Sequence, residues 1–256
     1  MNCWIGRISM ALSMLALGCG EAEPIDEEQS EAVGEAEDTV ALFSFSASET
    51  NDATVNTANF NFTISPNRDV MIGTDRIVGS SASGDTYLRL FDLSTGSPVQ
   101  VAEANDGPGG SPSAQIRYTT GATGWNFQVR AGCNGISECS GVVAIAQSKG
   151  NLSFSASNTD NATVNTIDQY YYFKAGQTIS FSTCPSVLYG ASNGGGLNYI
   201  RLLDRNGVEV AMYTNYNGCA EMNKTTHVAA LSDYYLLRAG CFDDLYCAGT
   251  VAIYAE

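Results

Sequence analysis

The chain has 256 residues and a formal net charge of −15, with 12 Lys and Arg against 27 Asp and Glu. This balance argues against nucleic acid as a partner, because nucleic-acid binding requires a basic face, and it leaves neutral glycans, cations and proteins. Glycine is abundant, at 26 residues, and the apolar residues occur in many short runs. Both features are typical of an all-β extracellular domain.

Residues 1–18 have the features of a secretory signal peptide. Arg7 supplies the positive charge, and residues 8–17 form a short apolar run. The run is shorter than the roughly 20 apolar residues that span a bilayer. A buried helix of the fold is the alternative, and the acidic tract that follows argues against it. The sequence therefore predicts an exported protein.

The next segment predicts a lipid anchor and a tether. Residues 15–19 (LALGC) resemble a bacterial lipobox that ends at Cys19, with Ala16 where leucine is expected. Ordinary signal cleavage before Cys19 is the alternative. Residues 20–40 contain many acids and neither Lys nor Arg, which predicts disorder because like charges repel and little apolar surface is present. We expect residues 19–40 to be a lipidated cysteine and an acidic disordered tether. The membrane partner is then the bacterial cell envelope, in the outer membrane or at the cell surface.

An internal repeat organises the remaining chain. Residues 44–57 (SFSASETNDATVNT) and 153–166 (SFSASNTDNATVNT) are identical at eleven of fourteen positions. Such self-similarity indicates a duplicated structural unit. The sequence therefore predicts two homologous modules, residues 41–147 and 151–256, joined by residues 148–150.

Further landmarks recur in the same order in both modules. Residues 84–92 (GDTYLRLFD) match residues 196–204 (GLNYIRLLD), and both alternate with the period of a strand. Residues 125–132 (WNFQVRAG) match residues 233–240 (DYYLLRAG). We expect each module to be an antiparallel β-sandwich of roughly seven to nine short strands.

The cysteines predict three disulfides. Each module has two cysteines directly after Arg-Ala-Gly with five residues between them, and two more occur only in the second module, as a bonded pair would. Cys3 leaves with the signal peptide, so Cys19 remains without a partner, which favours its lipidation. Zinc is the alternative, but the spacing does not fit C-x2-C sites and export favours oxidation. The predicted pairs are Cys133–Cys139, Cys184–Cys219 and Cys241–Cys247.

The landmarks resemble those of the bacterial pre-peptidase C-terminal (PPC) domain. The resemblance is carried by the turn at residues 175–177 (AGQ), the hairpin at 84–96, the loop at 105–107 (NDG) and the strand at 124–130. It implies jelly-roll-like sandwiches that are commonly accessory to secreted peptidases, and calcium occurs in related collagen-binding modules. No peptidase domain accompanies the modules here, so the accessory role is not carried over.

Two groups of residues are candidates for ligand sites. Asp85, Asp92 and Asp106 lie near expected strand ends and are candidate calcium ligands, although Asp92 also suits an Asx-turn. Three tyrosines beside Gly- or Asn-rich turns could stack on sugars or peptides, and packing within the sandwich is the alternative. These tyrosines are Tyr189, Tyr213 and Tyr216.

Nothing in the sequence indicates catalysis. His227 is the only histidine, and no nucleophile elbow, HExxH or Cys-His motif is present. We predict a non-enzymatic, surface-anchored protein that binds extracellular glycan or protein through its loops, with the second module carrying the affinity. One alternative is a secreted hydrolase, or a subunit accessory to one, whose site the sequence does not reveal. The other is a structural envelope protein with no discrete ligand.

Overall fold

The computed structural model describes residues 41–216, except 109, 111 and 123–124, and then residues 219 and 224–256. The predicted signal peptide, Cys19 and the tether lie outside these residues. The described part consists of strands and connecting turns, so the predicted all-β class is confirmed. None of the described residues forms a helix that could cross a membrane.

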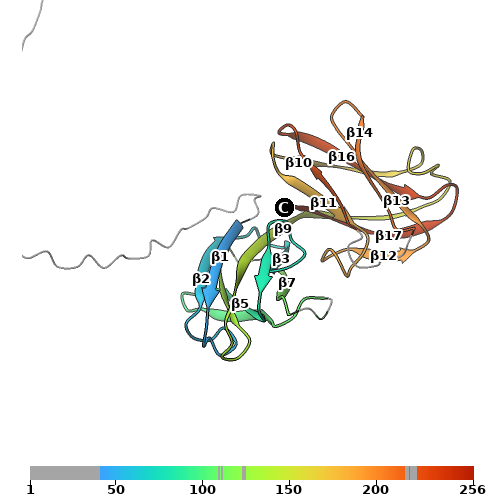
Figure 1. The fold of residues 1–256 in the computed structure, drawn as a ribbon. Coiled ribbons are helices and arrows are strands. Elements are labelled where there is room, and N and C mark those ends of the chain that lie inside the picture. The colour runs from blue at the N-terminus through green and yellow to red at the C-terminus, as the bar shows by residue number, and fades with distance from the viewer. Residues whose placement is uncertain (1–40, 109, 111, 123–124, 217–218, 220–223) are drawn as a thin grey trace, which may run out of the picture. The chain divides into compact units, whose positions relative to one another are not determined.

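The first module contributes eight strands and the second another eight, with β9 between them (Figure 1). The strands before β9 are β1 (Ala41–Ala47), β2 (Ala58–Thr63), β3 (Asp69–Gly73), β4 (Ser81–Ser83), β5 (Thr86–Asp92), β6 (Val99–Ala104), β7 (Gln115–Thr119) and β8 (Asn126–Cys133). From β9 onward they are β9 (Cys139–Ala156), β10 (Ile167–Phe173), β11 (Thr178–Ser182), β12 (Ser192–Gly195), β13 (Asn198–Leu203), β14 (Glu209–Thr214), β15 (Thr225–Val228), β16 (Asp233–Cys241) and β17 (Cys247–Ala255).

Three antiparallel sheets build the two sandwiches. Each module has a four-stranded sheet of its own, β2-β8-β5-β6 in the first and β10-β16-β13-β14 in the second. Both modules share a nine-stranded sheet with the path β15-β11-β17-β9-β3-β7, to which β1, β4 and β12 also pair. Residues 148–150, the expected joint, lie inside β9. The chain therefore passes between the modules without leaving the shared sheet.

The alternating strands put their apolar residues into the core, as the sequence predicts. Leu88 and Leu90 of β5 are fully buried, and so are Ile200 and Leu202 of β13. They pack against apolar residues of the shared sheet in two core clusters; the one that contains Ile200 and Leu202 also includes Met71 and Ala146 of the first module. The outward-facing positions of the same strands therefore form the exposed face of each four-stranded sheet.

The repeated segment forms an unusual turn in each module. Asn51, Asp52 and Ala53 have successive φ angles of 47°, 57° and 53°, and residues 160–162 have 45°, 54° and 57°. The amide of Thr54 donates to the carbonyl of Thr50 at 2.9 Å. Each segment is thus one turn of left-handed helix, a conformation that costs about 1–2 kcal/mol per residue outside glycine.

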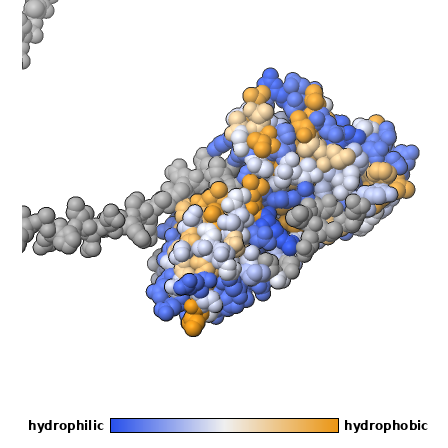
Figure 2. Space-filling model, viewed as in Figure 1, coloured by the Kyte–Doolittle hydropathy of each residue, from blue (hydrophilic) through white to orange (hydrophobic). Residues whose placement is uncertain are grey.

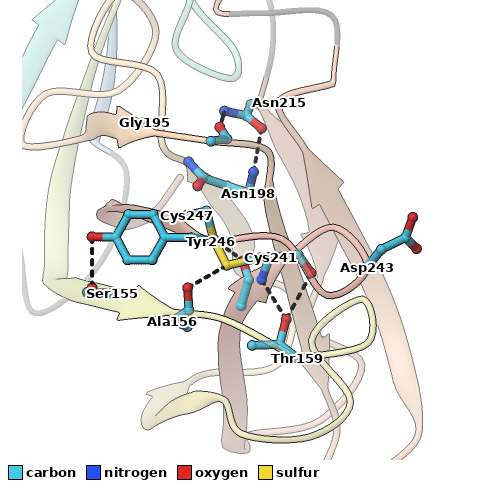
Figure 3. Close-up of a disulfide and its surroundings, with 12 residues drawn as sticks. Ser155, Ala156, Thr159, Gly195, Asn198, Asn215, Cys241, Asp243, Tyr246 and Cys247 are labelled. Atoms are coloured by element: carbon cyan, nitrogen blue, oxygen red, sulfur yellow. Dashed lines mark hydrogen bonds between the residues drawn. A yellow bond between two sulfur atoms is a disulfide. The ribbon is translucent and has the colours of Figure 1, made fainter.

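A threonine clamp offsets this cost. In the second module, Thr159 Oγ donates to the carbonyl of Cys241 at 2.9 Å and accepts from its amide at 2.7 Å (Figure 3). In the first module, Thr50 makes the same two bonds to Cys133, at 2.8 and 2.7 Å. Gly240 lies beside the clamp, where a Cβ atom would approach Thr159 Oγ to 2.8 Å. The identity of the two repeats therefore reflects a shared structural requirement.

Thr159→Val tests the clamp while keeping the side-chain shape. We expect the free energy of unfolding to fall by about 2 kcal/mol or more, because the buried amide and carbonyl of Cys241 both lose their partner. Thr163→Val is the matched control, since the Thr163 hydroxyl donates to the Asp160 carbonyl at an exposed position, and about 0.5 kcal/mol or less is expected there. Urea unfolding of the full chain measures both; equal losses would contradict the clamp.

Three disulfides join the predicted cysteines. The pairs are Cys133–Cys139, Cys184–Cys219 and Cys241–Cys247. The first and third close the short connection before β9 and before β17. The second joins the segment after β11 to the segment after β14.

Candidate ligand-binding site

The three aspartates proposed as calcium ligands do not form one site. Asp85 precedes β5 and Asp92 ends it, so a strand of this length separates them by about 23 Å. Asp106 follows β6 at the end of the sheet opposite Asp92, because Ala104 pairs with Leu88. Among the described residues, no group of three or more His, Cys, Asp or Glu could hold a metal ion. The three aspartates therefore do not form one ligand set, and calcium binding stays a prediction.

The alternative role of Asp92, formation of an Asx-turn, is confirmed, and Asp204 of the second module forms the same kind of turn. Asp92 Oδ1 accepts from the amide of Ser94 at 2.8 Å. Asp204 Oδ1 accepts from the amides of Val208 at 2.9 Å and Asn206 at 2.8 Å. These N–H groups, that of Val208 first, hold the pKa of Asp204 below its ordinary value.

The three predicted ligand-binding tyrosines lie in different surroundings. Tyr213 is 2% exposed, and its hydroxyl lies 3.0 Å from Cys184 Sγ in the core. Tyr213 therefore offers no surface to a ligand, because its register on β14 points it inward beside Ile200. Tyr189 is half-buried, and its hydroxyl accepts from Thr119 Oγ at 3.1 Å. Tyr216 is 64% exposed and is the one of the three that faces solvent freely.

The single histidine packs against a tyrosine ring. The His227 ring lies 5.9 Å from the ring of Tyr235. Burial lowers the pKa of His227. His227 also pairs with Ile179 along the strands and lines a hollow of about 120 Å³ with Asp204 and Asp233.

The outer face of the β10-β16-β13-β14 sheet gathers exposed aromatic residues. The registers place Asp168 opposite Arg238, Tyr170 opposite Leu236 and Tyr172 opposite Tyr234. The outward residues of the sheet are thus Asp168, Tyr170 and Tyr172 of β10, Tyr234, Leu236 and Arg238 of β16, Tyr199, Arg201 and Leu203 of β13, and Glu209, Met212 and Thr214 of β14. Figure 2 shows hydrophobic residues among hydrophilic ones over this part of the second module.

We call Tyr170, Tyr172 and Tyr234 the tyrosine cluster. Their side chains are 60%, 41% and 56% exposed, respectively. The rings of Tyr172 and Tyr234 meet edge to face with centroids 5.3 Å apart. Leu203 and Leu236 lie on the same face but are buried. The cluster is therefore a solvent-facing aromatic surface on a rigid strand pair.

Opposite charges next to the cluster pair with one another. Arg238 binds Asp168 with an N–O distance of 3.2 Å, and Arg201 binds Glu209. Arg201 Nε also donates to the carbonyl of Asn161 in the left-handed turn, at 2.7 Å. The charges of this band cancel, so the face has no net sign that would select a charged ligand.

A second group of aromatic residues lies beyond the charged band. A hollow of about 550 Å³ is lined by Asn161, Tyr199, Met212, Thr214, Tyr216 and Phe242. Tyr216 and Phe242 rings are 5.8 Å apart, and Tyr199 and Phe242 rings 6.4 Å apart. We call this the aromatic hollow. Tyr216 is the single sequence-predicted ligand residue that it contains.

The equivalent face of the first module is polar and bonded to itself. Asn61, Thr63 and Asn126 stand where the second module has the three tyrosines of the cluster, as the matching registers show. Gln128 donates to Asn61 Oδ1 at 3.0 Å and accepts from Arg130 Nε at 2.8 Å. Asn61, Gln128 and Arg130 thus bond to one another, and the two aromatic rings of this face, Tyr87 and Phe91, each have an arginine guanidinium over them.

The first module has a separate polar hollow of about 730 Å³ along β1, β4 and β9. Glu49 and Glu138 are among its lining residues. In the second module Tyr246 occupies the place of Glu138, and its hydroxyl lies 3.2 Å from Ser155 Oγ (Figure 3). The second module therefore has a hydrogen-bonded tyrosine at the position where the first module has a carboxylate.

Comparison with protein-family models and with curated proteins finds no match. Among solved structures, the periplasmic g-type lysozyme inhibitor PliG of Aeromonas hydrophila is 13% identical, covering 42% of this chain and 85% of its own, at a TM-score of 0.29. The tandem CBM22 domain of Xyn10C from Paenibacillus barcinonensis is 10% identical, covering 85% of this chain and 91% of its own, at a TM-score of 0.29. These likenesses establish neither a common family nor a common function, and the PPC resemblance stays a prediction.

Proposed function

We propose that the protein is a non-enzymatic binding protein that recognises neutral glycan on the outer face of the β10-β16-β13-β14 sheet. The observation that carries this proposal is the tyrosine cluster, three exposed rings where the first module has Asn and Thr. Exposed tyrosines combine an apolar ring, on which a sugar face can stack, with a hydroxyl that can bond to sugar oxygens.

Charge supports glycan over other ligands. The arginines beside the cluster are each paired with a carboxylate, so the face offers polar groups without a net charge. A neutral polyhydroxylated ligand fits such a surface, because it needs hydrogen bonds and stacking rather than an opposite charge. A nucleic acid does not, since it requires unpaired basic groups.

Alanine substitution at the cluster tests the proposal. The full chain is titrated against insoluble cellulose, xylan, mannan, chitin and β-1,3-glucan, with depletion from solution as the measurement. We expect Tyr170→Ala and Tyr234→Ala each to weaken binding about tenfold, the loss of one stacked ring. Tyr246→Ala is the control, because Tyr246 is equally exposed and lies outside this face. Absence of binding to all five polysaccharides, or an equal loss in the control, would contradict the proposal.

We also propose that the protein is exported and attached to the cell envelope through Cys19. The three disulfides support export, because such bonds persist in oxidising compartments. The lipobox-like residues before Cys19 support the attachment.

A further inference from the structure

We infer that the tyrosine cluster and the aromatic hollow are two subsites for one ligand, a linear neutral glycan that lies along β13 and β16. This inference rests on the proposed function and specifies its ligand as a chain long enough to reach both subsites. The aromatic hollow provides the second aromatic surface, and the charged band between the two subsites provides hydrogen-bond donors.

The two subsites lie on one face in the direction of the strands. Tyr234 and Gly240 are six residues apart on β16, and Gly240 pairs with Tyr199 at the hollow. At about 3.3 Å per residue, the tyrosine cluster and the hollow are about 20 Å apart. A chain that runs along these strands therefore meets an aromatic surface at each end, whereas one or two sugar rings reach only one of them.

The charged band supplies donors between the subsites. Arg238 uses Nε and Nη2 to bind Asp168, and Arg201 uses Nε and Nη1 to bind Asn161 and Glu209. A guanidinium has five N–H donors, so each arginine keeps N–H groups that no described side chain accepts. These groups can donate to the hydroxyls of a chain that crosses the band.

The first module lacks the cluster and part of the hollow, although Tyr87 keeps the place of Tyr199. Asn134 stands where the hollow has Phe242, and Glu103 where it has Met212. The tyrosines of the cluster are replaced as well, by Asn61, Thr63 and Asn126. The second module therefore carries exposed aromatic residues at both ends of the face, as one extended ligand would require.

The hollow is held in place before any ligand arrives. Phe242 follows Cys241, which is bonded to Cys247. Asn161 belongs to the left-handed turn that the Thr159 clamp fixes. Arg201 is anchored to that turn through the Asn161 carbonyl. A preorganised surface loses less conformational entropy on binding. The difference in affinity between a short and a long glycan then depends on the number of contacts each makes.

The test compares chain lengths by calorimetric titration of the full chain. The probes are the linear disaccharides and hexasaccharides of β-1,4-glucose, β-1,4-xylose, β-1,4-mannose, β-1,4-N-acetylglucosamine and β-1,3-glucose. For the hexasaccharide that binds, we expect an affinity at least about tenfold above that of its disaccharide. We expect Tyr170→Ala and Tyr216→Ala each to lower hexasaccharide affinity about tenfold and to combine in the double variant, with Tyr246→Ala unchanged. The affinity for the disaccharide should fall in only one of these two single variants.

Two outcomes overturn the inference and leave the proposed function in place. The first is equal affinity for the disaccharide and hexasaccharide of the binding series. The second is hexasaccharide binding that one of the two substitutions leaves unchanged. Failure of every polysaccharide and every hexasaccharide to bind overturns the proposed function itself, and the inference with it.

Discussion

Replacing both Cys184 and Cys219 with alanine is expected to lower the free energy of unfolding by about 4 kcal/mol, against about 2 kcal/mol for the double replacement of Cys133 and Cys139. The two bonds close loops of different length, with sequence separations of 35 and 6. Closing a longer loop removes more conformational entropy from the unfolded chain. The loss of stability is therefore expected to be larger for the pair Cys184–Cys219 than for Cys133–Cys139.

Burial is similar at one cysteine of each pair. Cys184 and Cys133 are both fully buried, whereas Cys139 is buried and Cys219 is partly buried. Cys184 Sγ also contacts the buried Tyr213 hydroxyl at 3.0 Å, which adds to the loss in the second module. Urea unfolding of the full chain measures both variants. An equal loss, or a larger one at Cys133 and Cys139, would contradict the loop-length explanation.

The fold could be predicted from the sequence because its signals are local or repeated. The alternation at Leu88 and Leu90 identifies which residues enter the core, and burial agrees. The paired absence of two cysteines from the first module identifies the bond between Cys184 and Cys219. Each of these arguments needs only the order of residues along one strand or the alignment of two copies.

The site was predicted less well because it depends on pairing between distant strands. Tyr213 looked exposed beside a polar loop, but the register of β14 turns it toward Ile200. Tyr234 was missed, because it joins Tyr172 only through the pairing of β10 with β16. The available signal was the contrast between residues 233–240 and 125–132, where the second module has Tyr and Leu in place of Asn and Gln.

Repeat identity and ligand recognition therefore fall on different residues. The identical positions of the repeat include Thr159 and Ala162, which form the clamp and the left-handed turn. The positions that differ between the modules include Tyr170, Tyr172 and Phe242, which lie on the proposed binding face. The duplicated segment forms the same stabilised turn in each module. The neighbouring strands carry the exposed residues that differ between the modules.

Cys19→Ser is expected to move the protein from the membrane fraction to the soluble fraction of a bacterium that processes lipoproteins. Residues 1–18 are the proposed export signal, and residues 15–19 are the lipobox-like segment. The three disulfides account for every cysteine after Cys19, so a thiol at position 19 has no partner within the chain, and lipidation removes it. Without the lipid, the acidic residues 20–40 provide no apolar surface that would keep the protein at a membrane.

Cys3→Ser is the matched control for this experiment. Cys3 lies within the signal peptide, so its replacement is expected to leave both the mature mass and the fractionation unchanged. The mass of the purified mature chain should show an added lipid with native Cys19 and none in Cys19→Ser. If Cys19→Ser remains in the membrane fraction, as the Cys3→Ser control does, attachment through Cys19 is refuted, because the protein then stays at the membrane without a lipid on residue 19.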